Sequence, residues 1–133
     1  MLGVEVVSLR LVDARFYHLD TCFCPLDGGY LLYYPPAFDA QSNHMIECLV
    51  PPELRIAIDE TDALHFACNA INIGSTIIMN KTSAAFLQRL QAAGFAAIER
   101  EMTEFLKAGG AAKCLTLRVN EPRQHQWMAS QTA

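Results

Sequence analysis

The arrangement of short apolar segments between proline and glycine breaks is the feature that most limits the folds open to this chain. These segments are rich in β-branched and aromatic residues, which favour strands. Residues 25–29 (PLDGG) form a strong turn signal, so the segments on either side of them predict a β-hairpin. Residues 65–73 fit either a regular strand or a strand that contains a β-bulge. The predicted strands cover residues 4–11, 16–24, 30–34, 55–59, 65–73, 76–79, 95–98 and 114–119.

Two other segments carry the spacing of amphipathic helices. Residues 38–49 end before two prolines, and the second helix begins at a cap, Thr82 or Ser83, and runs to about residue 93 before a glycine. Residues 101–107 fit either a helix or a strand. The predicted buried faces are Phe38, Met45, Ile46 and Leu49 in the first helix, and Phe86, Leu87 and Leu90 in the second. Strand pairs joined through helices predict a mixed α/β fold.

Composition restricts the class of protein further. The chain has 133 residues, of which 52% are hydrophobic and 18% charged, enough for one domain with a core. We expect this domain to cover residues 1–120 and the polar residues 121–133 to form a flexible tail. The net charge is −4, and no basic run supports nucleic-acid binding. No segment reaches the ~20 apolar residues of a membrane span. No signal peptide is evident, so a cytoplasmic location is expected.

Cysteine usage raises the question of a reactive thiol. The chain has five cysteines, an odd and scattered set, and a disulfide framework is not expected in a chain with this much core. Most are predicted to be small buried hydrophobic residues. Cys22 and Cys24 alternate with His18 and allow a metal reading. The chain lacks the paired CxxC knuckles of structural zinc sites, so burial is the better account.

His18-Leu19-Asp20 is the first candidate for chemistry. On a strand, residues two apart point to the same face, so the imidazole and carboxylate would project together with Leu19 in the core. A carboxylate beside a histidine favours the protonated ring, which can donate a proton to a leaving amine, and it can also bind a cation. The alternative is a surface-facing polar pair at a strand end, and the motif taken alone favours this alternative.

Cys114 is the second candidate. It follows the small-residue loop 109–112 (GGAA), which leaves room for a substrate and offers backbone N–H groups. Lys113 adds positive charge beside the thiol. A buried cysteine that begins a core strand is an equally good reading of the same pattern.

Several other polar residues have no partner in the sequence. Asn69 and Asn72 could form a polar pocket wall or be satisfied core amides, and the sequence slightly favours the second reading. Glu104 is expected to be solvated, with site-facing as the alternative. His44 and His65 are expected to be ordinary surface or core histidines.

Residues 16–26 (FYHLDTCFCPL) and 104–117 (EFLKAGGAAKCLTL) together resemble the guanidino-group-modifying enzymes. These include arginine deiminase, arginine dihydrolase, dimethylarginine dimethylaminohydrolase and the amidinotransferases. The likeness is strongest to the arginine dihydrolase and deiminase branch. The order of His-x-Asp, hairpin, Asn-containing strands, Gly-Gly loop and Cys is kept over nearly the whole chain. Each motif is weak by itself, whereas the ordered pair is fairly specific.

The resemblance implies a pentein-type α/β propeller built from ββαβ units, and it assigns roles to matching positions. Cys114 would be the nucleophile, His18 the general acid/base and Asp20 a guanidinium-binding carboxylate. We also place Asn69, Asn72 and Glu104 among candidate substrate contacts. An arginine-like small molecule is the implied substrate, hydrolysed through a Cys thiouronium intermediate, with no cofactor and no metal. Hydrolysis and amidino transfer both remain open.

Length is the main departure from this family, whose members are about twice as long. The chain would be the C-terminal part of such an enzyme, and its opening in an apparent core strand suggests a domain cut from something longer. The site would be completed by an N-terminal half or by a homo-oligomer, because open sheet edges favour pairing with another chain. A non-catalytic pentein-like module that binds arginine or a protein is the alternative function, and a structural half-propeller that only oligomerises is a third.

Overall fold

A computed structural model describes residues 3, 5–117 and 119 of the chain. The tail predicted for residues 121–133 lies outside the described residues, as do parts of the strands predicted at residues 4–11 and 114–119. The helices and strands, in chain order, are β1 (Phe23–Pro25), β2 (Leu31–Tyr33), α1 (Ala40–Leu49), β3 (Arg55–Ala57), α2 (Glu60–Leu64), β4 (Ile71–Ile73), β5 (Thr76–Asn80), α3 (Ala84–Ala92), β6 (Ala96–Arg100) and α4 (Thr103–Lys107).

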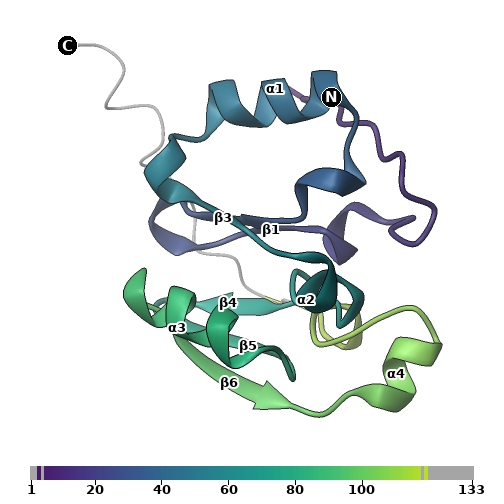
Figure 1. Cartoon of the computed structure of the whole chain (residues 1–133), viewed down its shortest axis with the longest axis vertical. Coiled ribbons are helices and arrows are strands. Elements are labelled where there is room, and N and C mark those ends of the chain that lie inside the picture. The colour runs from purple at the N-terminus through teal and green to yellow at the C-terminus, as the bar shows by residue number, and fades with distance from the viewer. Residues whose placement is uncertain (1–2, 4, 118, 120–133) are drawn as a thin grey trace.

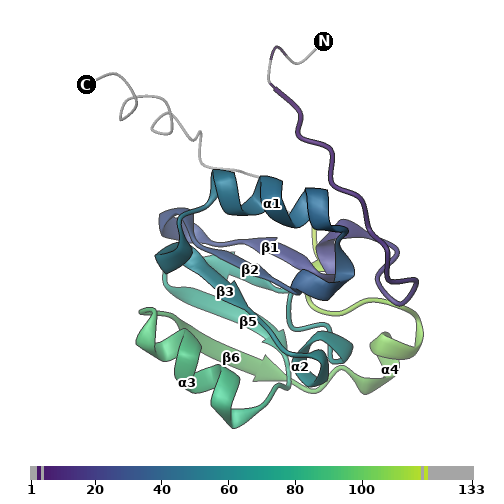
Figure 2. The same cartoon turned by 45° about the horizontal axis from the view of Figure 1, so that its top comes forward.

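The described chain folds into two ββαβ units with the same topology. In the first, β1 pairs antiparallel with β2, and β2 pairs parallel with β3 after the chain returns through α1. In the second, β4 pairs antiparallel with β5, and β5 pairs parallel with β6 after α3. Each sheet therefore has its hairpin on one side and its parallel strand on the other. Figures 1 and 2 show α1 beside the first sheet and α3 beside the second. The mixed α/β fold and the ββαβ unit are confirmed.

Local sequence explains why the hairpin and the helices form. The β1–β2 turn passes through Gly28 at φ 77°, a left-handed conformation that glycine adopts without a steric penalty. Helix α1 is capped by Asp39, whose carboxylate accepts a hydrogen bond from the Ser42 N–H at 2.8 Å. Helix α3 is capped by Ser83, one of the two predicted caps, which accepts from the Phe86 N–H at 3.2 Å. Phe86 and Leu90 are buried one turn apart, as predicted.

Four predicted strands differ from the structure. Residues 5–10 form no ladder, and only Leu11 makes an isolated bridge, with Phe38. The strand predicted at 16–24 shrinks to β1 because the 3₁₀ segment η1 (Leu19–Thr21) precedes it. The strand predicted at 65–73 shrinks to β4, since Phe66 at φ 52° turns the backbone after α2. Cys114 lies in the 3₁₀ segment η5 (Lys113–Leu115) and not in a strand.

Two helix predictions also need correction. Helix α2 was not predicted; Asp59 caps it by accepting a hydrogen bond from the Asp62 N–H at 2.9 Å. Leu49, predicted to be buried in α1, has 57% of its surface exposed, because it stands at the last turn of the helix. The ambiguous residues 101–107 contain helix α4.

A continuous apolar core and a few buried polar groups join the two units. The carboxylate of Asp62 on α2 is buried and accepts from both the N–H and the hydroxyl of Ser83, at 2.7 and 2.8 Å. The thiol of Cys24 in β1 lies 3.6 Å from the carbonyl oxygen of Ala70, next to β4. These contacts tie α2 to the start of α3, and β1 to the segment before β4.

Candidate active site

The side chain of Asn69 is the centre of the candidate site. It is fully buried between α2 and β4, and its amide nitrogen lies 3.1 Å from the Asp20 carbonyl oxygen and 3.2 Å from an Asp20 carboxylate oxygen. The same nitrogen is 3.1 Å from the Cys114 sulfur. Its amide oxygen accepts hydrogen bonds from the N–H groups of Ala111 and Cys114, at 2.9 and 3.2 Å. One buried amide thus holds two segments that are far apart in the sequence.

Asp20 and Cys114 meet directly at this point. The thiol lies 3.5 Å from the Asp20 carboxylate oxygen that Asn69 also contacts. Cys114 is exposed and Asp20 is half-buried, so both can be reached from solvent. Cys114 lies in η5 and does not begin a strand, contrary to the prediction, and its exposed thiol contradicts the alternative of a buried cysteine. The thiol–carboxylate pair can approach a small cation from the same side.

His18 stands at the start of η1, and not on a strand face beside Asp20. Its backbone carbonyl accepts hydrogen bonds from the Thr21 N–H and hydroxyl, which close the turn of η1. Leu19, which was expected in the core, has 44% of its surface exposed in this turn. The His18 ring packs edge-on against Tyr17, with ring centroids 4.7 Å apart. Within the described part of the chain, the ring has no hydrogen-bond partner. An unpartnered imidazole on the exposed surface is available to exchange protons.

Tyr17 connects the histidine to the glycine loop, a role that sequence reasoning missed. Its hydroxyl donates a hydrogen bond to the Gly109 carbonyl oxygen at 3.2 Å. Gly109 has φ 84°, and a Cβ there would clash with the Tyr17 hydroxyl oxygen. In the sequence, the only sign of this role of Tyr17 is its position next to His18.

The other cysteines contrast with Cys114. Burial raises the pKa of the Cys22 thiol to about 12 and also raises the pKa of the Cys24 and Cys68 thiols. These thiols are therefore protonated at neutral pH and unreactive, as expected for core cysteines. Cys48 is exposed on α1, with its sulfur 3.6 Å from a ring nitrogen of His44.

Asn72 and Glu104 lie in other local networks. Asn72 accepts from the Asp27 N–H at 2.6 Å and donates to the carbonyl oxygens of Gly74 and Thr76, bonds that tie the β4–β5 hairpin to the β1–β2 turn. Glu104 on α4 is exposed and pairs with Lys107 at 2.7 Å. The structure thus brings Asp20, Asn69 and Cys114 together, and it gives neither of these other residues a contact with them.

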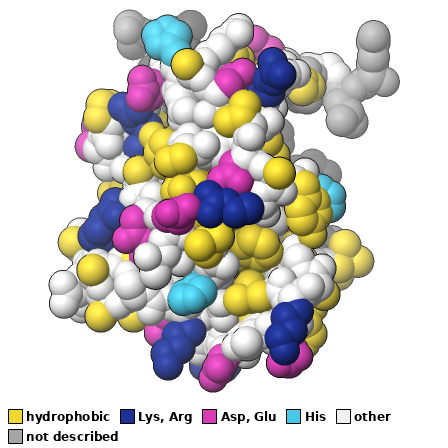
Figure 3. Space-filling view, turned by 45° about the vertical axis from the view of Figure 1, so that its right-hand side comes forward, with side chains coloured by type: hydrophobic (Ala, Val, Ile, Leu, Met, Phe, Trp, Pro, Cys, Tyr) yellow, Lys and Arg dark blue, Asp and Glu magenta, His cyan; other side chains and the backbone are white. Residues whose placement is uncertain are grey.

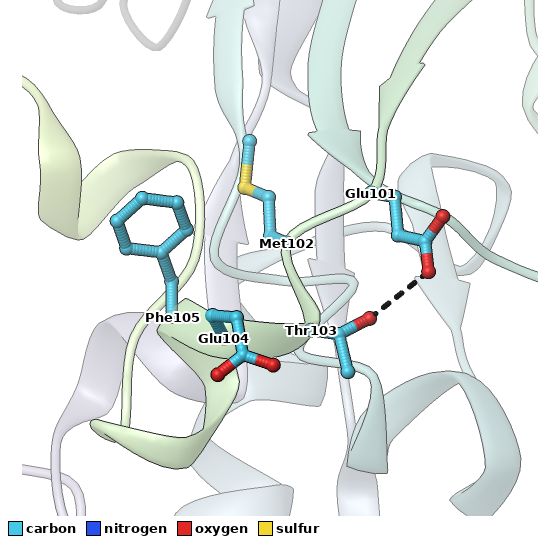
Figure 4. A pocket seen from close by; sticks show the side chains of 5 residues that line it. All are labelled: Glu101, Met102, Thr103, Glu104 and Phe105. Carbon is cyan, nitrogen blue, oxygen red and sulfur yellow. Dashed lines mark hydrogen bonds between the residues drawn. The ribbon is translucent and has the colours of Figure 1, made fainter.

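An open pocket of about 370 Å³ lies at the start of α4 and is lined by Glu101, Met102, Thr103, Glu104 and Phe105. Figure 4 shows the Thr103 hydroxyl hydrogen-bonded to the Glu101 carboxylate on one side of the pocket, and the Phe105 ring on another side. The pocket has none of the three clustered residues in its lining, so we place the candidate site at Cys114.

The surface, the metal-ligating residue types and the helices add three observations. Acidic and basic side chains are interspersed on the face in Figure 3, with hydrophobic groups between them. Among residues 3, 5–117 and 119, no group of three His, Cys, Asp or Glu side chains could hold a metal ion. No helix in the described part of the chain is both long and apolar enough to cross a bilayer.

Comparison with known proteins finds relatives of this chain, although no family model matches it. It is 67% identical over 121 residues to the bifunctional arginine dihydrolase/ornithine cyclodeaminase ArgZ of Synechocystis, covering 91% of this chain and 17% of ArgZ. It is 40% identical to the dimethylarginine dimethylaminohydrolase of Mycobacterium tuberculosis, covering 90% of this chain and 39% of that protein. These homologues are members of the guanidino-group-modifying superfamily, and the chain matches a region of each of these larger proteins.

Solved structures of this superfamily confirm the fold. The crystallised N-terminal domain of ArgZ, bound to product, aligns with a TM-score of 0.89 and 67% identity, covering 91% of this chain and 44% of that domain. The guanidino-modifying pentein fold is thus established for the chain, together with its ββαβ units. The chain spans less than half the length of each of these relatives.

Proposed function

We propose that this chain is the part of an arginine-type guanidine hydrolase that carries the nucleophile. The observation that carries the proposal is the 3.5 Å approach of the exposed Cys114 thiol to the half-buried Asp20 carboxylate, both of which are held by Asn69. The relatives support it: ArgZ has been crystallised as a cysteine-to-serine variant bound to substrate, and as another variant covalently bound to a reaction intermediate.

The residue types suit an attack on a guanidinium carbon. That carbon is electron-poor but stabilised by resonance, so a strong nucleophile such as a thiolate is needed. A carboxylate binds the planar cation by paired hydrogen bonds and fixes the angle of approach. Because the Asp20 oxygen already contacts the sulfur, a guanidinium bound there would present its carbon to Cys114.

The proposed reaction proceeds in two half-reactions. The Cys114 sulfur forms a bond to the guanidinium carbon, and the C–N bond to the leaving nitrogen breaks as His18 donates a proton to it. The amine departs and leaves a thiouronium on Cys114. Water then loses a proton to His18 and attacks the same carbon, which breaks the C–S bond and regenerates the thiol. From arginine, one cycle gives citrulline and ammonia, and a second cycle on citrulline gives ornithine, ammonia and carbon dioxide.

Further carboxylates and the contacts to the substrate's own carboxylate would come from polypeptide outside the matched region. They would be supplied by a complementing N-terminal half or by another copy of the chain. We propose a cytoplasmic location and the five-unit propeller of the superfamily for the completed protein. The second candidate function is a non-catalytic arginine- or protein-binding module.

Labelling with a cationic alkylating agent distinguishes these functions. Chloroacetamidine mimics a guanidinium, whereas chloroacetamide is neutral and otherwise similar, so the ratio of their alkylation rates at one thiol reports recognition of the cation. Cys48 is the internal control, because it is exposed but has no carboxylate bonded to its sulfur. Mass spectrometry of tryptic peptides measures both thiols in the same sample.

We expect the amidine-to-amide ratio to be at least about tenfold higher at Cys114 than at Cys48, as an oriented charge pair would produce. Asp20→Asn should abolish the difference, and His18→Ala should slow amidine labelling at Cys114. Equal ratios at the two thiols in the wild-type chain would overturn the catalytic proposal and favour the binding module.

A further inference from the structure

Asn69 has no capacity left to bind a substrate. Its amide nitrogen carries two N–H donors, and three acceptors already lie within 3.2 Å: the Asp20 carbonyl, the Asp20 carboxylate and the Cys114 sulfur. Its amide oxygen has two lone pairs, and the N–H groups of Ala111 and Cys114 occupy both. The side chain is also fully buried. These contacts speak against the substrate-binding role expected from the sequence.

The backbone of Asn69 adds to the same link. Its carbonyl oxygen accepts from the Lys113 N–H at 3.1 Å, so three N–H groups of the cysteine loop end on this one residue. Within the described residues, no strand pairing joins η1 to the loop that carries Cys114. The separation between thiol and carboxylate is therefore set by a side chain and not by a sheet.

We propose that Asn69 is a positioning residue that sets the distance between the Cys114 thiol and the Asp20 carboxylate. The role rests on the proposed function, since it matters only if the two groups act on one substrate. The amide oxygen holds the cysteine loop, and the amide nitrogen holds η1 and the sulfur. The amide oxygen thus fixes the backbone of Cys114, and the amide nitrogen fixes both Asp20 and the Cys114 sulfur.

Two variants separate the halves of the amide. Asn69→Ala removes both sets of hydrogen bonds. Asn69→Asp has nearly the same shape and keeps the acceptor for the loop, but it loses the donors to Asp20 and to the sulfur. Asn80→Ala is the matched control. Asn80 is also buried, donates to the His65 carbonyl oxygen at 2.9 Å and accepts from the Met102 N–H at 2.9 Å, without touching Cys114.

The first measurement is the amidine-to-amide labelling ratio at Cys114, with thermal unfolding of each variant alongside. We expect both Asn69 variants to lose about tenfold in this ratio, because displacement of a reacting group by about 1 Å can cost two orders of magnitude. Asn80→Ala should lose stability and keep the ratio. A substrate-binding Asn69 would give the opposite result for Asn69→Asp, since an added carboxylate attracts the cationic reagent.

The second measurement does not depend on labelling. Crystal structures of the variants give the distance from the Cys114 sulfur to the Asp20 carboxylate, which should exceed 3.5 Å in both Asn69 variants and stay unchanged in Asn80→Ala. If Asn69→Ala fails to fold, Asn69→Asp carries the test. Retention of the distance in the Asn69 variants would overturn the inference. If the wild-type chain shows no preference for the amidine over the amide, the proposed function is overturned. The positioning role of Asn69 is then decided by the crystallographic distance alone.

Discussion

Replacing Gly110 with alanine tests whether the loop next to Cys114 must lack a side chain. A Cβ at position 110 would lie 2.8 Å from the Cys114 Cβ and 3.3 Å from its sulfur. Ordinary contacts begin at 3.4 Å, so one of the two residues must move by about 0.6 Å. The obstructing atom is the Cβ of Cys114, which moves only with its backbone.

The size of the effect follows from the bonds that this movement strains. The Cys114 N–H is held by Asn69 at 3.2 Å, and its sulfur is held at 3.1 Å. A shift of several tenths of an ångström lengthens both bonds beyond good geometry. Since a misplacement of 1 Å can cost about 100-fold in reactivity, we expect the amidine-to-amide ratio at Cys114 to fall by about 10-fold.

Gly74→Ala is the matched control. Gly74 has φ 57°, and a Cβ there would meet nothing within 4 Å. Alanine at that position pays about 1–2 kcal/mol for a left-handed backbone but touches no part of the site. Gly74→Ala should therefore lose stability in urea denaturation and keep wild-type labelling of Cys114. Wild-type labelling in Gly110→Ala would refute the claim that a close approach of this loop sets the thiol position.

Three further predictions concern the rest of the molecule. Tyr17→Phe removes the bond to Gly109 and should lower the free energy of unfolding by about 0.5–1.5 kcal/mol in urea; an unchanged value would argue against the bond in solution. The Ser42 N–H lowers the pKa of Asp39, so this cap stabilises α1 at neutral pH and is lost as pH falls through the lowered folded-state value. The difference in thermal midpoint between wild type and Asp39→Ala should accordingly be present at pH 7 and disappear in strong acid; a difference that persists there would refute the charged cap. Leu90→Ala, in the core, should lower the free energy of unfolding in urea by about 2–5 kcal/mol. Leu49 is exposed, so the free energy of unfolding of Leu49→Ala should stay near the wild-type value.

Much of the local structure could be read from the sequence because it depends on near neighbours. The β1–β2 hairpin follows from a glycine turn, and α3 follows from the Ser83 cap and the buried Phe86 and Leu90. The ββαβ unit was implied by resemblance alone. The two units share hydrogen-bond topology without an evident repeat of residues, so the residue pattern alone does not predict their repetition.

Where strand predictions were wrong, a competing local hydrogen bond or a missing partner decided the outcome. Residues 5–10 are rich in apolar side chains that favour a strand, yet within the described part of the chain they have no ladder to join. His18-Leu19-Asp20 also fits a strand by alternation, but the turn of η1 is closed by bonds from Thr21 to the His18 carbonyl. The same turn directs Asp20 to Asn69.

By itself, the sequence determined the residue types available for chemistry, helices α1 and α3, the β1–β2 hairpin and the resemblance to a superfamily. Only the tertiary structure decided which of the candidates meet. Asp20 and Cys114 are 94 positions apart, and the amide that joins them lies 49 positions from one and 45 from the other. The physical reason is that periodicity and capping act over a few residues. Contacts between distant segments depend instead on how two packed units are oriented, and no local pattern encodes that.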